Sequence, residues 1–200
     1  MRINEAVWEG ERPGQGWHAH GWTSKGLWVV DADRLVWLKL RKRRWLHVAT
    51  GTTCHSRPDW DVPNSPYGLD VAFYVLGVWL LAVHGLHHVA WPWSAQHAER
   101  PSRRTAQRML QRIAPDADRW LTGLRLALID LVAPRPLEEI LPAGGIPPPE
   151  GCNHVTQGSA HACKLRGAVW IANCGVRSLP ISMRRLLGVA RRRAAEHLPQ

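Results

Sequence analysis

Apolar residues recur at helical spacing most clearly between positions 102 and 113. Ser102 is a good N-cap for this stretch, and Pro101 stops any helix that would run in from upstream. One helical face carries an apolar residue at i, i+3, i+4 and i+7, namely Ala106, Met109, Leu110 and Ile113. Because arginine and glutamine occupy most other positions, the pattern predicts a short amphipathic helix with a basic exposed face.

Three further stretches also favour helices. Positions 70–84 are apolar on every side, which is typical of a buried helix around which others pack. Their run of thirteen consecutive non-polar residues is too short to cross a membrane, which takes about 20. We expect the other two helices over 116–132 and 182–196, and the second of these carries a basic surface.

Strand-like segments near the N-terminus predict a small sheet. Segments 27–30 and 35–40 flank an Asp-Ala-Asp turn and indicate a β-hairpin, and 45–50 indicates a third strand. The basic run 41–44 separates the last two, where it would contact phosphates or form a charged sheet edge that resists aggregation. The expected fold is mainly α with a small N-terminal β-hairpin or sheet and a helix-turn-helix-like helical bundle.

Composition divides the chain into four regions. They are a small β-rich basic segment (1–63), a helical domain (64–136), a Pro- and Gly-rich linker (137–151), and a weakly structured basic region with a terminal helix (152–200). Within the helical domain, helices over 70–84, 86–91 and 102–113 would form a helix-turn-helix unit. Pro92 and the long turn over 94–100 depart from the regular form of that motif.

The charge balance favours a polyanionic partner. The chain carries 26 Lys and Arg against 16 Asp and Glu, which gives a net charge of +10 and a pI near 10.5. Most of this excess lies in the second half, where 15 basic residues face 7 acidic ones. Nucleic acid is therefore the preferred partner over an anionic membrane. The absence of a secretory signal and of paired cysteines predicts a cytoplasmic protein with reduced thiols.

Two groups of side chains are candidates for contact with DNA. In the 102–113 helix, arginine can pair with guanine and glutamine with adenine: Arg103, Arg104, Gln107, Arg108 and Arg112. Phosphate contacts that do not depend on base sequence would come from Arg41, Lys42, Arg43, Arg44, Arg191, Arg192 and Arg193. The alternative for the helix is a basic, solvated surface on a small core.

Metal binding is a second class of function that the sequence allows. Two thiolates and two imidazoles, a zinc ligand set, are available from Cys152, His154, His161 and Cys163. Their one-residue spacings differ from those usual in zinc sites, so unconstrained loop residues are the alternative. A further group at helical spacing is His84, His87 and His88, which more often marks the polar end of a core helix. No Gly-rich phosphate loop, HExxH or GxSxG occurs, and we expect neither an enzyme nor a cofactor.

The order of these motifs resembles the N-terminal region of insertion-sequence transposases, in which a zinc ribbon precedes a helix-turn-helix. The main match is Ser-Arg-Arg-Thr-Ala-Gln-Arg-Met-Leu at 102–110, which resembles the recognition helix. The matches upstream are His20-Gly21, Arg43-Arg44, Gly51, Thr53, Pro58-Asp59-Trp60, Pro63 and Tyr67. The resemblance covers about residues 18–135 and implies a transposase-derived module that binds double-stranded DNA.

The resemblance departs from the family at the zinc ribbon. The two expected knuckle cysteines fall on His47 and Thr50, which predicts a degenerate sheet without metal. No acidic catalytic domain follows, so strand transfer is not implied. The predicted partner is duplex DNA, with a homodimer allowed and no membrane partner. The alternatives are a zinc-binding protein or metal-dependent enzyme that uses the Cys/His cluster, and a decayed mobile-element fragment.

Overall fold

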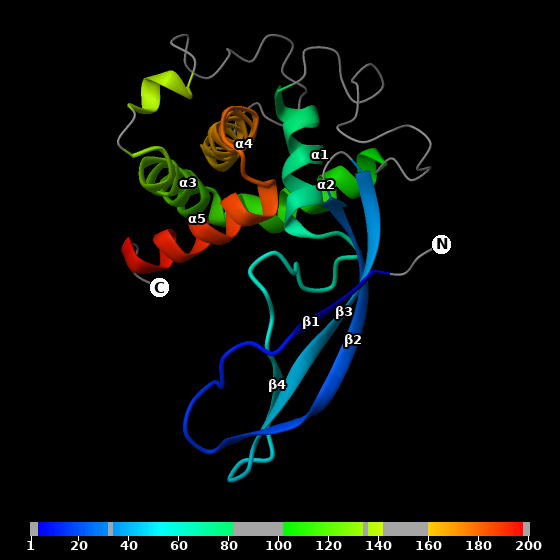
Figure 1. Cartoon of the computed structure of the whole chain (residues 1–200). Helices are drawn as coiled ribbons and strands as arrows, with labels where there is room; N and C mark the ends of the chain where they lie inside the picture. Colours follow the sequence, from blue (N-terminus) through cyan, green and yellow to red (C-terminus); the bar gives the residue numbers. More distant parts are fainter. Residues whose placement is uncertain (1–3, 32–33, 82–101, 134–135, 142–159, 198–200) are drawn as a thin grey trace.

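The computed structural model describes residues 4–31, 34–81, 102–133, 136–141 and 160–197 (Figure 1). These residues form a four-stranded sheet followed by helices. The strands are β1 (Asn4–Trp8), β2 (Trp17–Asp31), β3 (Arg34–His47) and β4 (Thr53–His55). The helices are α1 (Leu69–Leu81), α2 (Arg103–Ile113), η1 (Ala114–Asp116), α3 (Ala117–Val132), η2 (Leu137–Glu139), α4 (Ala160–Ser178) and α5 (Met183–His197).

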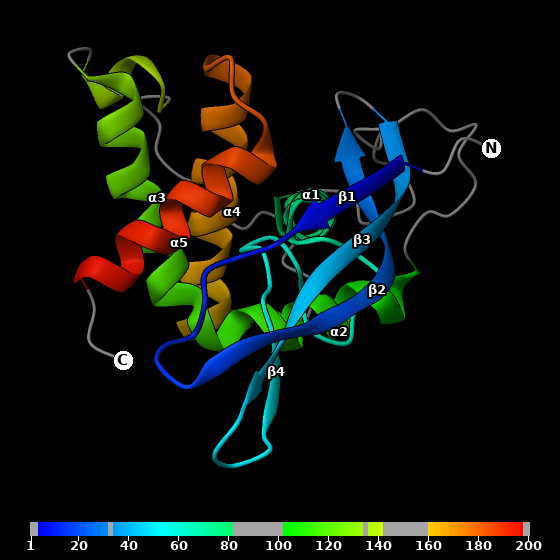
Figure 2. The ribbon, with the colours of Figure 1, turned by 60° about the horizontal axis from the view of Figure 1, so that its bottom comes forward.

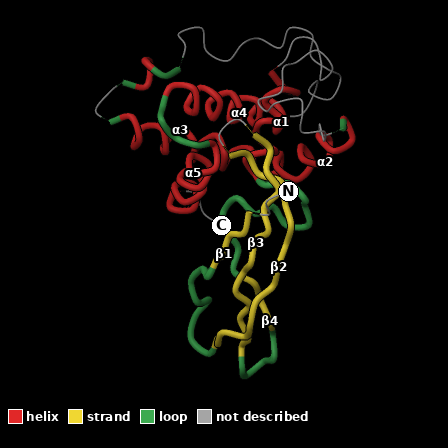
Figure 3. Tube along the Cα trace, turned by 45° about the vertical axis from the view of Figure 1, so that its right-hand side comes forward, coloured by secondary structure: helices red, strands yellow, loops and turns green. Residues whose placement is uncertain are grey.

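The sheet is built around β3. On one edge, β2 pairs antiparallel along almost the whole of β3, with Trp28 opposite Trp37. On the other edge, β1 pairs parallel with residues 38–42, and β4 pairs antiparallel with residues 44–46. The result is a long ribbon that extends away from the helices, with the turn between β3 and β4 at its far end (Figure 3). We call these four strands the arm.

Alternation along the strands gives the arm two different faces. Leu27, Val29, Leu38 and Leu40 are buried together on one face, and Trp60 packs against them. On the other face, the rings of Trp28 and Trp37 meet edge to face at 5.2 Å. Gly26 also lies on that face, where a Cβ atom would come within 2.2 Å of the Trp37 ring. Only glycine fits beneath this tryptophan without a shift.

The helices pack around α1, and we call α1–α5 with η1 and η2 the body. Figure 2 shows α3, α4 and α5 together on the side of α1 that faces away from the sheet. Phe73 of α1 is fully buried, and its ring meets Trp120 of α3 edge to face at 5.2 Å. At Gly123, α3 approaches α5 so closely that a Cβ atom would lie 2.2 Å from the carbonyl oxygen of Ala190. These contacts join the helices into one core.

The sequence predicted four of these helices closely. The expected helices over 70–84, 102–113, 116–132 and 182–196 correspond to α1, α2, α3 and α5. The helix α4 forms in a segment to which the pattern assigned no element, and it packs against α1 and α3. The predicted short helix over 86–91, Pro92 and the turn over 94–100 lie outside the described residues.

The predicted fold class is wrong. The chain has an α+β fold with a mixed four-stranded sheet, and it is not a mainly α helix-turn-helix-like bundle with a small hairpin. The sheet was underestimated because the basic run 41–44 continues β3, and because β1 lacks an apolar period yet pairs with the edge of β3. The expected third strand over 45–50 is instead the end of β3 and a turn.

A search of the described helices for a membrane-spanning segment gives a negative result. Even α1, whose residues are almost all apolar, has only 13 residues, fewer than the roughly 20 that a bilayer requires. In the structure, α1 contacts α2, α4, α5 and β2, and its apolar surface is covered by these neighbours.

Candidate functional site

The amphipathic helix α2 is fixed by its cap and by its apolar stripe. Ser102 Oγ accepts a hydrogen bond from the backbone N–H of Thr105 at 3.2 Å, which confirms the predicted N-cap. The stripe predicted from the sequence is buried in the core of the body: Ala106, Met109, Leu110 and Ile113. Since this face is held against the core, the opposite face of α2 keeps a fixed orientation toward solvent.

The opposite face of α2 is basic and lacks carboxylates. The side chains of Arg104, Arg108 and Arg112 are exposed, and Gln107 is half-buried beside them. Arg103 begins the helix, but its side chain is outside the described residues. The helix contains no acidic residue, and the described part of the chain provides no ion pair to Arg104, Arg108 or Arg112. An external anion can therefore meet these arginines without displacing a carboxylate of the described residues.

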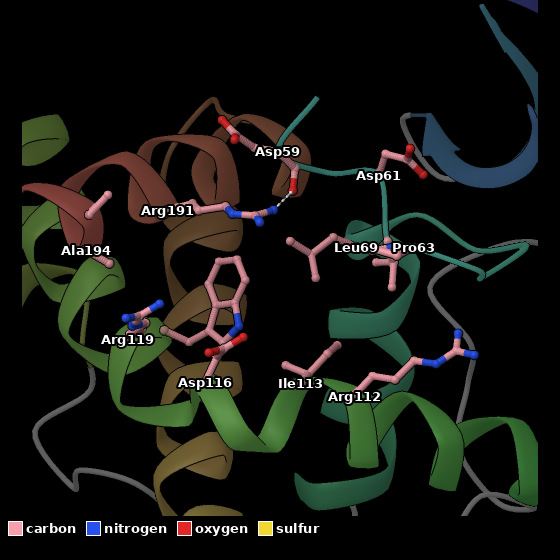
Figure 4. Close-up of a pocket in the computed structure, with 13 residues that line it drawn as sticks. Asp59, Asp61, Pro63, Leu69, Arg112, Ile113, Asp116, Arg119, Arg191 and Ala194 are labelled. Atoms are coloured by element: carbon pink, nitrogen blue, oxygen red, sulfur yellow. Dashed lines mark hydrogen bonds between the residues drawn. The ribbon is translucent and has the colours of Figure 1, made fainter. Parts of the chain in front are cut away.

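A cleft opens where α2 ends. It has a volume of about 470 Å³ and lies between α2, η1, α3, α5 and the segment that precedes α1. Arg112 and Arg119 lie on opposite sides of it, with Arg191 at a third position (Figure 4). The other lining residues are Asp59, Asp61, Val62, Pro63, Leu69, Ile113, Asp116, Trp120, Ala194 and Ala195. Arg112 and Arg191, which the sequence predicted from separate helices, thus line one cleft, and the Arg112 guanidinium group is directed away from Arg191 (Figure 4).

The basic run of α5 points in several directions. Arg191 Nη1 donates to the backbone carbonyl of Asp59 at 2.8 Å, and Arg192 Nη1 lies 3.5 Å from the Asp59 carboxylate. Arg193 pairs with Asp130 at 2.5 Å and with Glu196 at 2.8 Å. Arg193 is therefore neutralised within the body, whereas Arg191 faces the cleft.

The basic run of β3 is divided between the two faces of the arm. Lys42 is only 7% exposed, and its ammonium group lies 2.7 Å from the Asp61 carboxylate. Lys25 of β2 contacts the other oxygen of Asp61 at 2.5 Å, so the two lysines share one buried carboxylate. We leave Lys42 out of the candidate DNA-binding surface because its charge is used inside the protein.

The arginines of β3 also have partners within the arm. The guanidinium carbons of Arg43 and Arg41 lie 3.9 and 5.4 Å from the centre of the Trp22 ring. Arg43 also pairs with Glu9 at 3.1 Å, and Arg41 lies 3.9 Å from Glu5. Arg44 is half-buried on the same face as Lys42, and its Nε has no partner among the described atoms. An external anion would compete with these contacts at Arg41 and Arg43.

Sequence reasoning missed a buried charge that connects arm and body. Asp70 of α1 is fully buried and accepts hydrogen bonds from the backbone N–H of Val30 at 2.9 Å and from Arg184. Arg184 of α5 also donates to the carbonyl of Val30 at 3.0 Å. Burial raises the pKa of Asp70, and the nearby Arg184 opposes that rise. The signal available in the sequence was an aspartate at the start of an otherwise apolar helix.

The residues at the predicted knuckle do not fit a zinc ion. His47 Nδ1 lies 2.9 Å from Thr50 Oγ1, and the turn is closed by hydrogen bonds from Gly51 to His47 and from His47 to Thr52. A tetrahedral site requires about four ligands, and within the described residues no three His, Cys, Asp or Glu side chains gather to hold a metal. The turn is stabilised by hydrogen bonds instead.

The second candidate metal set is only partly described. His161 and Cys163 lie in the first turn of α4, and their two-residue separation places the positions about 200° apart around the helix axis. Cys152 and His154 lie outside the described residues, as do His84, His87 and His88. The described helix does not bring positions 161 and 163 to one side of α4.

Comparisons with family models, curated proteins and solved structures give no match to this chain. The resemblance to transposase N-terminal regions accordingly stays a prediction from the sequence. The exposed face of α2 and the adjoining cleft are the most distinctive surfaces of the described residues.

Proposed function

We propose that the protein is a non-catalytic DNA-binding protein whose helix α2 lies against duplex DNA. The observation that carries this proposal is an exposed arginine and glutamine face on a capped helix whose opposite face is buried. An α-helix fits the major groove of B-DNA, where arginine pairs with guanine and glutamine with adenine. Arg104, Gln107 and Arg108 are placed to contact bases, and Arg112 to contact a phosphate at the end of the helix.

The dimensions of α2 suit this role. A helix with its side chains is about 10–12 Å across, which fits the major groove at about 12 Å wide, and the 11 residues of α2 extend for about 16 Å. The positions 104, 108 and 112 are four residues apart and lie along one side of the helix. Arg191 of α5 is exposed and lines the cleft at the end of α2, and it supplies a further cation for the DNA backbone.

The proposal is tested by measuring duplex affinity as a function of salt concentration. A fluorescently labelled duplex is titrated with the full chain at several salt concentrations, and affinity is read from anisotropy. Each phosphate contact contributes about −0.9 to the slope of log affinity against log salt. Replacing Arg104, Arg108 and Arg112 by alanine should weaken binding and make the slope shallower by up to about 2.7, with base contacts contributing less.

Two control variants remove a positive charge elsewhere. Lys164→Ala and Arg193→Ala each remove a cation that pairs with a carboxylate in the body. We expect both variants to bind DNA like the wild type, with a similar slope. Affinity that does not change with salt, or equal losses in the triple variant and the controls, would contradict the proposed role of α2.

A further inference from the structure

The cleft beside α2 has the size and lining of a small-ligand site. Its volume of about 470 Å³ falls within the usual range for ligand pockets, about 300–1,000 Å³. One part of the lining is apolar and includes Val62, Pro63, Leu69, Ile113 and Trp120. The remaining lining is mostly arginine and aspartate. Such a division suits a ligand with a flat apolar part and a charged part.

The positive charges of the cleft come from three helices. Arg112 is at the end of α2, Arg119 is in α3 and Arg191 is in α5. A guanidinium group presents a planar fork of donors that matches the oxygens of a phosphate. The bond from Arg191 to the Asp59 carbonyl fixes that guanidinium group and leaves further N–H donors on it.

Two of the three carboxylates of the cleft are engaged by cations that do not line it. The side chain of Asp61 is 0% exposed and is already shared by Lys25 and Lys42. The carboxylate of Asp59 faces Arg192 at 3.5 Å. Asp116 is exposed at the cleft, where a carboxylate can accept hydrogen bonds from hydroxyl or amino groups of a ligand. The cleft therefore combines phosphate donors, an acceptor and an apolar wall.

We propose that this cleft binds a single nucleotide. Its phosphate lies on Arg191, its base lies against the apolar wall, and Asp116 accepts from its sugar or base. The same chemistry is offered by a free mononucleotide and by an unpaired nucleotide at the end of a DNA strand. The inference does not depend on duplex binding by α2, although the two surfaces share Arg112.

Binding of the free nucleotide is measured by isothermal titration calorimetry on the full chain with deoxyadenosine monophosphate. Because both halves of the ligand contribute, we expect inorganic phosphate and deoxyadenosine each to bind at least about tenfold more weakly than the nucleotide. Arg191→Ala should weaken nucleotide binding about tenfold or more. Arg193→Ala is the matched control, because Arg193 is on the same helix but pairs with Asp130 and Glu196.

A second variant fills the cleft without removing any charge. Ala195 is exposed and lines the cleft, so Ala195→Trp should abolish nucleotide binding while the unfolding midpoint stays near that of the wild type. The proposal would be overturned if the wild type bound no detectable nucleotide, or if Arg191→Ala and Ala195→Trp both bound it as tightly as the wild type. If the protein binds duplex DNA through α2 but does not bind the nucleotide, only the proposal for the cleft is rejected. If it binds the nucleotide but not duplex DNA, only the proposed role of α2 is rejected.

The source of the nucleotide is identified with two labelled duplexes that differ in one unpaired 5′ nucleotide. Tighter binding of the overhanging duplex, with the gain lost in Ala195→Trp, would assign the cleft to DNA ends. Equal affinity for the two duplexes, together with binding of the free nucleotide, would assign it to a mononucleotide in solution.

Discussion

The strand β3 and the helix α2 both carry runs of positive charge, and among the residues that the structure describes the two runs differ in how far their charges are paired. In β3, Lys42 is buried on Asp61, while Arg41 and Arg43 lie near Trp22 and near glutamates of the N-terminal segment. In α2, Arg104, Arg108 and Arg112 are exposed and have no carboxylate partner within the described residues. A count of charges therefore does not identify a binding surface, because it omits the partners.

The difference follows from the periods of the two elements. Side chains of a strand alternate between its faces, so the run 41–44 sends cations toward both sides of the arm, where acidic and aromatic groups meet them. In α2 the apolar stripe occupies one face, and the arginines that are four residues apart lie together on the other face. Four predictions test the charges of the arm and of α2, and the cap that holds α2 in place.

The largest effect is expected at Asp61, which holds two lysines of the arm. Asp61→Ala would leave Lys42 buried without its partner, and we expect the free energy of unfolding to fall by about 3–5 kcal/mol. Urea denaturation followed by circular dichroism measures the loss. Asp118→Ala is the control, because Asp118 forms an exposed pair with Lys164, and its loss should be below about 1 kcal/mol. Equal losses would mean that the arm lysines do not depend on Asp61.

The second prediction compares two pairs of arginines in duplex binding. The double variant Arg104→Ala/Arg108→Ala should bind duplex DNA about 2 kcal/mol more weakly than the wild type, because each arginine can make a base or phosphate contact. Arg41→Ala with Arg43→Ala should cost less, because these arginines already contact Trp22, Glu5 and Glu9. Anisotropy titrations at one fixed salt concentration give both values. A greater loss of affinity in the Arg41→Ala/Arg43→Ala variant would indicate that β3, and not α2, forms the DNA-binding surface.

The third prediction concerns the rigidity of α2. Ser102→Ala removes the oxygen that accepts from the Thr105 N–H, and it should lower the free energy of unfolding by about 1 kcal/mol. Ser102→Asp retains a capping acceptor and should preserve most of that stability. Chemical denaturation of the two variants beside the wild type measures the difference. If both variants are as stable as the wild type, the cap does not stabilise α2.

The smallest effect is expected at His55 in β4. Burial lowers the pKa of His55, and the positive charges of Lys42, Arg57 and Arg44 lower it further because they disfavour the imidazolium form. Arg57→Gln should therefore move the pKa of His55 upward, and only in part, because burial is the larger cause and remains. NMR titration of the His55 ring detects the change, and Arg108→Ala should leave it unaltered. A downward shift in Arg57→Gln would contradict this assignment.

The helices were more predictable than the sheet because their signals are local. An apolar residue every third or fourth position, a serine cap and flanking prolines lie within about a dozen residues of one another, and they located α2 and α3 closely. The strand β1 has no such signal, because its place depends on hydrogen bonds to β3, more than 30 positions away. The basic run 41–44 indicates an exposed segment, whereas the structure buries Lys42 of this run. A lysine is tolerated there because its ammonium group pairs with Asp61.

By itself, the sequence determined the capped amphipathic helix α2, its buried stripe and its basic exposed face, as well as the excess of positive charge. The tertiary structure decided which of those charges are neutralised and where they gather. Lys25 and Lys42 reach Asp61 across 36 and 19 positions, and Arg191 reaches Asp59 across 132. Electrostatic interactions depend on distance in space and on burial, and neither quantity is encoded in the local order of residues.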